Sequence, residues 1–146
     1  MSDLRLFNTL SREKETFTPL RPGEARIYSC GPTVYGDPHI GNLRTFLWSD
    51  LLRRWLEYRG LTVTQVMNIT DVEDKIIRNA AAKGQDIFTY VAPYIDAFHA
   101  GLARLRIKPA NHYPRATEYI PQMVSLVEQL TERGHTYTAE GSTYFR

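Results

Sequence analysis

The chain carries two short runs of β-branched and apolar residues, at 26–30 and 62–69, of the kind that forms strands. Between them, apolar side chains recur at helical spacing from Leu43 to Leu56, and Gly60 marks the end of the predicted helix. Two strands joined by a helix-length crossover pair in parallel. The pattern therefore predicts an α/β fold built on a parallel sheet.

Further elements are predicted along the rest of the chain, without an internal repeat. They are an edge strand (4–9), a turn (19–23), helices (72–83, 87–105 and 117–134) and a hairpin (135–138 with 142–145). Pro93 marks either a late start or a kink in the second of these helices. The hairpin leaves an open edge where the sequence stops at Arg146, so we expect a truncation point there.

The loop between the first predicted strand and the first predicted helix is the most informative segment. It is rich in Gly and Pro and carries His39 just before the helix. Unpaired backbone N–H groups and the helix dipole make such a helix start attractive to anions. Gly36 and Gly41 let a nucleotide approach the backbone closely, and His39 can donate a hydrogen bond to a phosphate. A lone His after Pro38 can also be a simple turn residue.

Composition narrows the class of protein. A chain of 146 residues with 42% apolar residues fits one globular domain. The net charge of +2 is too small to indicate nucleic-acid binding by itself. The single cysteine excludes an internal disulfide and is typical of a reducing compartment. Because no signal peptide or membrane-length apolar run is found, we expect a cytoplasmic protein without a membrane partner.

Two motifs have a structural interpretation beside a functional one. Cys30 is either a small buried side chain or a zinc ligand, and the residues alone favour burial because there is no second cysteine. Thr70 and Glu73 have the spacing of a capping box, which accounts for the neighbouring acids without a metal. Thr70 also follows the second strand, whose carboxyl end faces the same cleft as the first.

Three ordered blocks carry a family resemblance. They are Cys30 to Tyr35 (CGPTVY) followed by His39 to Asn42 (HIGN), Asn68 to Ile76 (NITDVEDKI) and Pro114 to Glu118 (PRATE). Together they resemble the cysteinyl-tRNA synthetases, whose class I signature is H-I-G-H. The resemblance implies a Rossmann-like nucleotide-binding half. Residues 1–134 correspond to the amino-terminal part of the catalytic domain, and 135–146 to the truncated start of a connective insertion.

The resemblance also implies a reaction and a set of site residues. Cysteine and ATP would form cysteinyl-adenylate, and the cysteinyl group would pass to the 3′ end of tRNA(Cys). His39 and Asn42 would be catalytic, although Asn42 stands where the family usually has His. The ATP-binding residues would be Pro32, Thr33, Val34, Tyr35, Gly36, Asp37, Pro38, His39, Ile40, Gly41 and Asn42. The substrate-binding residues would be Thr33, Tyr35, Thr70 and Asp71.

The implied cofactors are one zinc ion and the Mg²⁺ that accompanies ATP. In this family the cysteine that corresponds to Cys30 is a zinc ligand, and the metal binds the substrate thiolate. A soft thiol binds zinc far better than the hydroxyl of serine does, which gives selectivity. The remaining ligands belong to a later segment that the sequence lacks, so we expect Cys30 to bind zinc weakly here.

Alternative functions remain open at this stage. One is the related ligase that joins cysteine to an amino sugar in mycothiol synthesis, by the same adenylate chemistry. Another is a non-catalytic nucleotide-binding or partner-binding module, because the sequence contains no K-M-S-K-S loop and no anticodon-binding region. For the same reason we expect this chain to be inactive alone.

Overall fold

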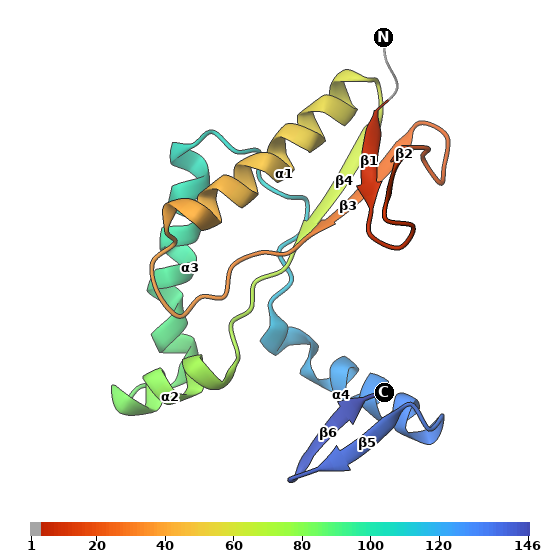
Figure 1. Cartoon of the computed structure of the whole chain (residues 1–146). Coiled ribbons are helices and arrows are strands. Elements are labelled where there is room, and N and C mark those ends of the chain that lie inside the picture. The colour runs from red at the N-terminus through yellow and green to blue at the C-terminus, as the bar shows by residue number, and fades with distance from the viewer. Residues whose placement is uncertain (1–3) are drawn as a thin grey trace.

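A parallel pair of strands with a helical crossover forms the centre of the protein. The computed structural model describes residues 4–146. Strands β3 (Glu24–Ser29) and β4 (Thr62–Met67) pair in parallel, with Glu24 opposite Thr62 and Ser29 opposite Met67. Helix α1 (Ile40–Tyr58) connects them and lies along the pair (Figure 1). The predicted strand–helix–strand unit is confirmed, with β3 starting two residues earlier than expected.

Residues 111–116 form a third extended segment that the sequence did not predict. They lie parallel to β4, with isolated bridges from Val66 to His112 and from Ile69 to Arg115. The backbone N–H of Met67 donates to the carbonyl of His112 at 3.0 Å, and that of Ile69 to the carbonyl of Pro114 at 2.8 Å. Strand β4 is therefore central, with β3 on one edge and 111–116 on the other.

Two helices connect β4 to this third segment. Helix α2 (Asp74–Ala82) leads into α3 (Ile87–Arg104), whose first turn is capped by Asp86. Asp86 accepts from the backbone N–H of Thr89 at 2.9 Å. Pro93 lies inside α3, so the helix does not start late at the proline. The helix begins six residues before Pro93.

The main core lies where α1, α2 and α3 meet the sheet and the loop after β3. Its largest fully buried side chains include Val34, Met67, Ile69, Ile76 and Phe98. Apolar side chains leave water here, which supplies the main driving force for this packing. Phe46 of α1 meets Phe98 of α3 edge-to-face, with ring centroids 5.2 Å apart. Val34 belongs to this core and thereby holds the loop after β3 against it.

A smaller core lies at the other end of the sheet. Strands β1 (Arg5–Asn8) and β2 (Glu13–Thr16) form an antiparallel hairpin. Leu4 and Phe17 at its ends pack with Ala25, Leu56 and Val63. The prediction of a single edge strand over 4–9 was therefore incomplete, because its partner strand is entirely exposed and carries no apolar pattern.

The carboxyl-terminal part stands away from the two cores (Figure 1). It comprises the 3₁₀ turn η1 (Ala116–Tyr119), helix α4 (Ile120–Glu132), and strands β5 (Thr136–Ala139) and β6 (Ser142–Phe145). The strands pair as the expected antiparallel hairpin. None of the side chains of α4 is buried. Within residues 4–146 no helix is long and apolar enough to span a bilayer.

An ion-pair network joins α1 to the segment that precedes 111–116. The buried Arg53 donates to the carboxylate of Glu57 at 3.0 Å and to the carbonyl of Pro109 at 2.7 Å. The Lys108 ammonium bonds the same carboxylate. The Lys108 hydrogen bond lowers the pKa of Glu57 from its ordinary value; burial opposes this, and Arg53 adds to it. Arg53 and Glu57 thus hold residues 108–109, which precede the third segment, against α1.

We expect Glu57→Gln to lower the free energy of unfolding by about 1 kcal/mol near pH 7, because a partly exposed ion pair is lost. The folded-state pKa lies below the unfolded-state value. The contribution of Glu57 is therefore present above the unfolded pKa of 4.5 and is lost as the pH falls through the folded pKa. Urea unfolding at a series of pH values should show the difference shrinking in acid.

The exposed Glu132 on α4 offers a control, because Glu132→Gln removes a carboxylate that has no ion-pair partner among the described residues. Its unfolding free energy should follow that of the unmodified chain at every pH. A Glu57→Gln difference that grew in acid would contradict the assigned role of the carboxylate.

Candidate functional site

The loop after β3 is fastened to the carboxyl end of β4. The backbone N–H of Thr70 donates to the carbonyl of Pro32 at 2.9 Å, and the N–H of Val34 donates to the carbonyl of Thr70 at 3.1 Å. The N–H of Gly31 donates to the side-chain oxygen of Asn68 at 3.1 Å. The first and second motif blocks therefore meet at the end of the sheet, where parallel α/β folds bind ligands.

Gly31 occupies the tightest position in this loop. A Cβ added there would lie 1.7 Å from the backbone oxygen of Asn68. Gly36 differs, because a Cβ there would meet nothing within 4 Å. At Gly41 an added Cβ would lie 2.9 Å from Cε1 of the His39 ring. Within this loop the chain itself therefore comes closest at Gly31 and Gly41. The predicted approach of a nucleotide to the backbone at Gly36 and Gly41 stays a prediction.

A pocket with a volume of about 260 Å³ opens between this loop and α3. Two of its walls come from Tyr94 and Phe98, which are four residues apart on one face of the helix. Their helical spacing alone does not distinguish a pocket wall from a core face. The other residues that line it are Gly31, Pro32, Thr33, Val34, Tyr35, Gly36, Asp37, Pro38, His39 and Asn42.

His39 caps the amino end of α1. Its Nδ1 accepts a hydrogen bond from the backbone N–H of Gly41 at 3.1 Å. The side-chain oxygen of Asn42 accepts in return from the backbone N–H of His39 at 3.1 Å, which completes a capping box. Helix α1 therefore begins at Ile40, three residues before the start that its apolar pattern indicated.

This cap determines the state of the His39 ring. Because Nδ1 accepts, the hydrogen bond assigns the ring proton of neutral His39 to Nε2. The ring thus keeps one donor that the cap does not use. The amide nitrogen of Asn42 is likewise left free to donate, since only its oxygen serves the cap. Both groups line the pocket beside the positive end of the helix dipole.

The predicted capping box at Thr70 and Glu73 is wrong. Helix α2 begins at Asp74, and Glu73 occupies the N-cap position without a side-chain cap hydrogen bond. The hydroxyl oxygen of Thr70 instead accepts from the Asn68 amide at 3.2 Å, which leaves the hydroxyl proton free to donate. Its backbone pairs with the loop, so the chain cannot turn into a helix there.

Asp71 is buried with only 1% of its surface exposed. Its two carboxylate oxygens accept from the backbone N–H of Thr117 at 2.9 Å and from the Thr117 hydroxyl at 2.6 Å. These bonds join the second motif block to the third. Neither Thr70 nor Asp71 is among the residues that line the pocket, so their substrate contacts stay a prediction.

Cys30 lies one residue beyond β3 and is exposed, so the expectation of a buried side chain is wrong. Its thiol lies 3.6 Å from the carbonyl of Gly31. Over residues 4–146 no group of three or more His, Cys, Asp and Glu side chains is placed to hold a metal ion. A single thiol does not make a zinc site, because zinc needs at least three protein ligands.

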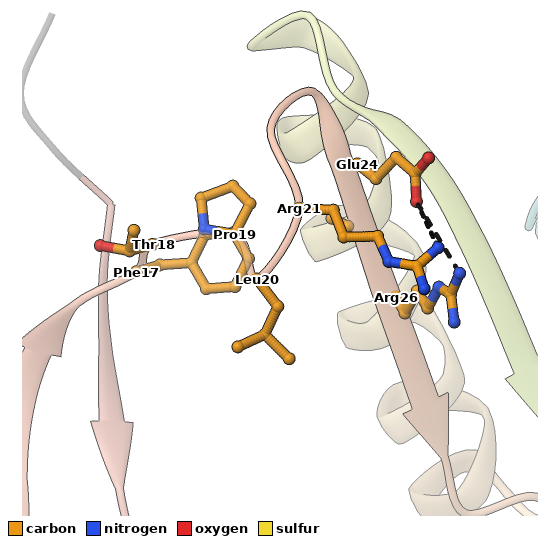
Figure 2. A pocket seen from close by; sticks show the side chains of 8 residues that line it. Phe17, Thr18, Pro19, Leu20, Arg21, Glu24 and Arg26 are labelled. Carbon is orange, nitrogen blue, oxygen red and sulfur yellow. Dashed lines mark ion pairs between the residues drawn. The ribbon is translucent and has the colours of Figure 1, made fainter.

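A second hollow, of about 310 Å³, lies at the amino end of β3, away from the motif blocks. Figure 2 shows Phe17, Pro19 and Leu20 on one side of it and two arginines on the other. The guanidinium groups of Arg21 and Arg26 approach the Glu24 carboxylate at 4.0 and 3.8 Å. Exposed pairs of this kind contribute little, and we assign no function to this hollow.

Comparison with known proteins gives one family. Residues 16–146 match the family model described as the tRNA synthetases class I (C) catalytic domain. Over 143 residues the chain is 50% identical to a cysteine–tRNA ligase of Methanosarcina mazei and 48% identical to one of Lacticaseibacillus casei. It is 44% identical over 142 residues to one of Pyrococcus horikoshii. These alignments cover 97–98% of this chain but only 30–31% of each relative.

Solved structures share the fold at lower identity. The LeuRS of a LeuRS–tRNA–LeuAMS complex from Agrobacterium radiobacter matches with a TM-score of 0.67 and 22% identity, over 82% of this chain and 16% of that one. A putative arginyl-tRNA synthetase from Campylobacter jejuni matches with a TM-score of 0.63 and 14% identity, over 84% of this chain and 37% of that one.

Proposed function

Because the chain belongs to the family of class I (C) tRNA synthetase catalytic domains, we propose that it forms the ATP-binding part of a cysteine–tRNA ligase. The reaction is ATP-dependent activation of cysteine, followed by transfer to tRNA(Cys). The observation that carries the proposal is the pocket at the amino end of α1, in which His39 keeps an unused donor. A tRNA substrate makes the cytoplasm its expected location.

In this proposal the loop binds ATP with its Mg²⁺ and holds the α-phosphate near the start of α1. The carboxylate of cysteine attacks the α-phosphorus, and the bond to the leaving pyrophosphate breaks. Negative charge grows on the phosphate oxygens, where the Nε2–H of His39 and the amide of Asn42 donate hydrogen bonds. Donors that are fixed before the reaction stabilise such charge without reorganisation, which is the source of the rate enhancement.

Substrate contacts are proposed for the residues at the ends of the two strands. Thr33 and Tyr35 line the pocket, and the free hydroxyl proton of Thr70 can donate to the amino acid. Cys30 would contribute one thiolate to a zinc ion whose remaining ligands lie outside this chain. Zinc would supply recognition of the cysteine thiol. No step that we assign to the residues of this chain depends on it.

The proposal is tested with a hybrid enzyme. This chain would replace the matching segment of the Methanosarcina mazei cysteine–tRNA ligase, to which it is 50% identical. We expect cysteine-dependent ATP–pyrophosphate exchange within about tenfold of the parent, because the pocket residues of this chain supply the donors that we assign to the step. Serine should give no exchange. The chain alone should give none above background, because it spans about 30% of the relatives' length.

Two results would contradict the proposal. A folded hybrid without exchange would show that the chain does not supply the adenylation site. Failure of the chain itself to bind ATP in a titration would argue against the pocket. The amino-sugar ligase and the non-catalytic module are less well supported, because the relatives at 44–50% identity are named cysteine–tRNA ligases.

A further inference from the structure

Tyr35 lies at the rim of the pocket, and its backbone is held more firmly than its ring. The carbonyl of Tyr35 accepts from the Tyr90 hydroxyl at 2.8 Å, and that hydroxyl accepts from the Asn79 amide at 3.1 Å. Tyr35 is 39% exposed, and over residues 4–146 its hydroxyl has no hydrogen-bond partner. Some other contact must therefore set the direction of the ring.

Lys75, in the first turn of α2, makes that contact. Its Nζ lies 3.6 Å from the centroid of the Tyr35 ring. An ammonium within about 6 Å of a ring centroid is attracted to the negative face of the ring. Among the described residues Lys75 forms no ion pair, so no carboxylate competes for its charge. The second motif block thus contacts the first through a cation and a ring as well as through the backbone.

We propose that Lys75 is a positioning residue for nucleotide binding, which holds the Tyr35 ring at the rim of the pocket by a cation–π contact. The inference rests on the proposed function, because it assumes that the pocket binds ATP. It assigns Lys75 a role through Tyr35 and not through direct contact with phosphate. Removal of the contact must then weaken the binding of a neutral nucleoside as much as the binding of ATP.

The test compares Lys75→Met and Lys75→Arg in the 146-residue chain. Met keeps the length of the side chain without its charge, whereas Arg keeps a cation that can lie over the ring. We expect Lys75→Met to weaken the binding of both ATP and adenosine by about three- to fivefold. This factor corresponds to the free energy of an exposed cation–π contact. Lys75→Arg should bind both ligands with affinities within about twofold of those of the unmodified chain.

A spectroscopic measurement separates positioning from a general loss of structure. Fluorotyrosine labelling gives the nine tyrosines separate ¹⁹F signals, and Tyr35→Phe identifies the one from Tyr35. That signal should move in Lys75→Met and stay in place in Lys75→Arg. Lys14→Met is the matched control, because it removes the same charge from an exposed position on β2 and Lys14 is not among the residues that line the pocket. It should leave the Tyr35 signal and both affinities unchanged.

The outcomes separate this inference from the proposed function. An unmoved Tyr35 signal, an unchanged affinity, or weaker binding of ATP but not of adenosine in Lys75→Met would overturn the positioning role and leave the proposed function intact. An unmodified chain that binds neither ATP nor adenosine would overturn the proposed function, and this inference with it.

Discussion

Gly31→Ala should destabilise the chain by about 3 kcal/mol or more, because the new methyl group meets backbone that cannot turn aside. The added Cβ would lie 1.7 Å from the carbonyl oxygen of Asn68 and 3.0 Å from Cγ of Met67. Relief requires the loop to move away from the end of β4. That movement breaks the bond from the Gly31 N–H to the Asn68 side chain and strains the pairing of Thr33 with Thr70.

Urea unfolding of the chain and of the variant measures this effect. Gly36→Ala is the control, because it adds the same methyl group to the same loop in open space. We expect its unfolding free energy to stay within about 0.5 kcal/mol of the unmodified chain. If Gly31→Ala were equally mild, the close approach of the loop to β4 would not exist in solution.

His39→Asn should abolish most of the adenylation activity while it preserves the fold. Asparagine is among the best helix N-caps, so its side-chain oxygen can replace Nδ1 as the acceptor for the first turn of α1. Its amide nitrogen ends one bond nearer the backbone than Nε2, so it does not take the place of the Nε2–H that we assign to the phosphate. We therefore expect ATP–pyrophosphate exchange by the hybrid enzyme to fall by about 100- to 1000-fold, as for the loss of one preorganised donor.

The comparison with His39→Ala separates the two roles of the residue. Alanine removes both the cap and the donor, so it should cost the same activity and, in addition, about 1 kcal/mol of stability. Stability is measured by urea unfolding of the chain, and activity by exchange in the hybrid. Exchange by His39→Asn within about tenfold of the unmodified hybrid would rule out a catalytic donor at this position.

The sequence was sufficient for the elements that depend on local periodicity. The apolar spacing from Leu43 to Leu56 and the β-branched runs beside it predicted α1, β3 and β4, and their parallel pairing followed from the crossover. The segment 111–116 could not be predicted in the same way. Pro114 and the polar residues around it give no strand pattern, and the segment is extended only because β4 supplies hydrogen-bond partners.

The sequence pointed to the loop that forms the candidate site, but not to the residues that support this loop. The Gly-rich segment and His39 could be singled out because a helix start that can bind an anion has a local signature in the sequence. Thr70 and Glu73 also had a local signature, that of a capping box, but tertiary contacts determine the structure there. The carboxylate of Asp71 accepts from Thr117, and the backbone of Thr70 pairs with the loop. The wall formed by Tyr94 and the contact between Lys75 and Tyr35 depend on how helices pack, which periodicity does not encode.

The central position of β4 sets the order in which the protein can fold during synthesis. One of its edges pairs with β3, which the ribosome has already released, but the other pairs with 111–116, which follows more than forty residues later. Such distant pairings form slowly, because the intervening chain must first be closed into a loop. Until residue 117 emerges, β4 presents an unpaired edge, and the carboxylate of Asp71 lacks Thr117, its hydrogen-bond partner. A pause in translation before this point would therefore prolong exposure of the nascent chain to aggregation.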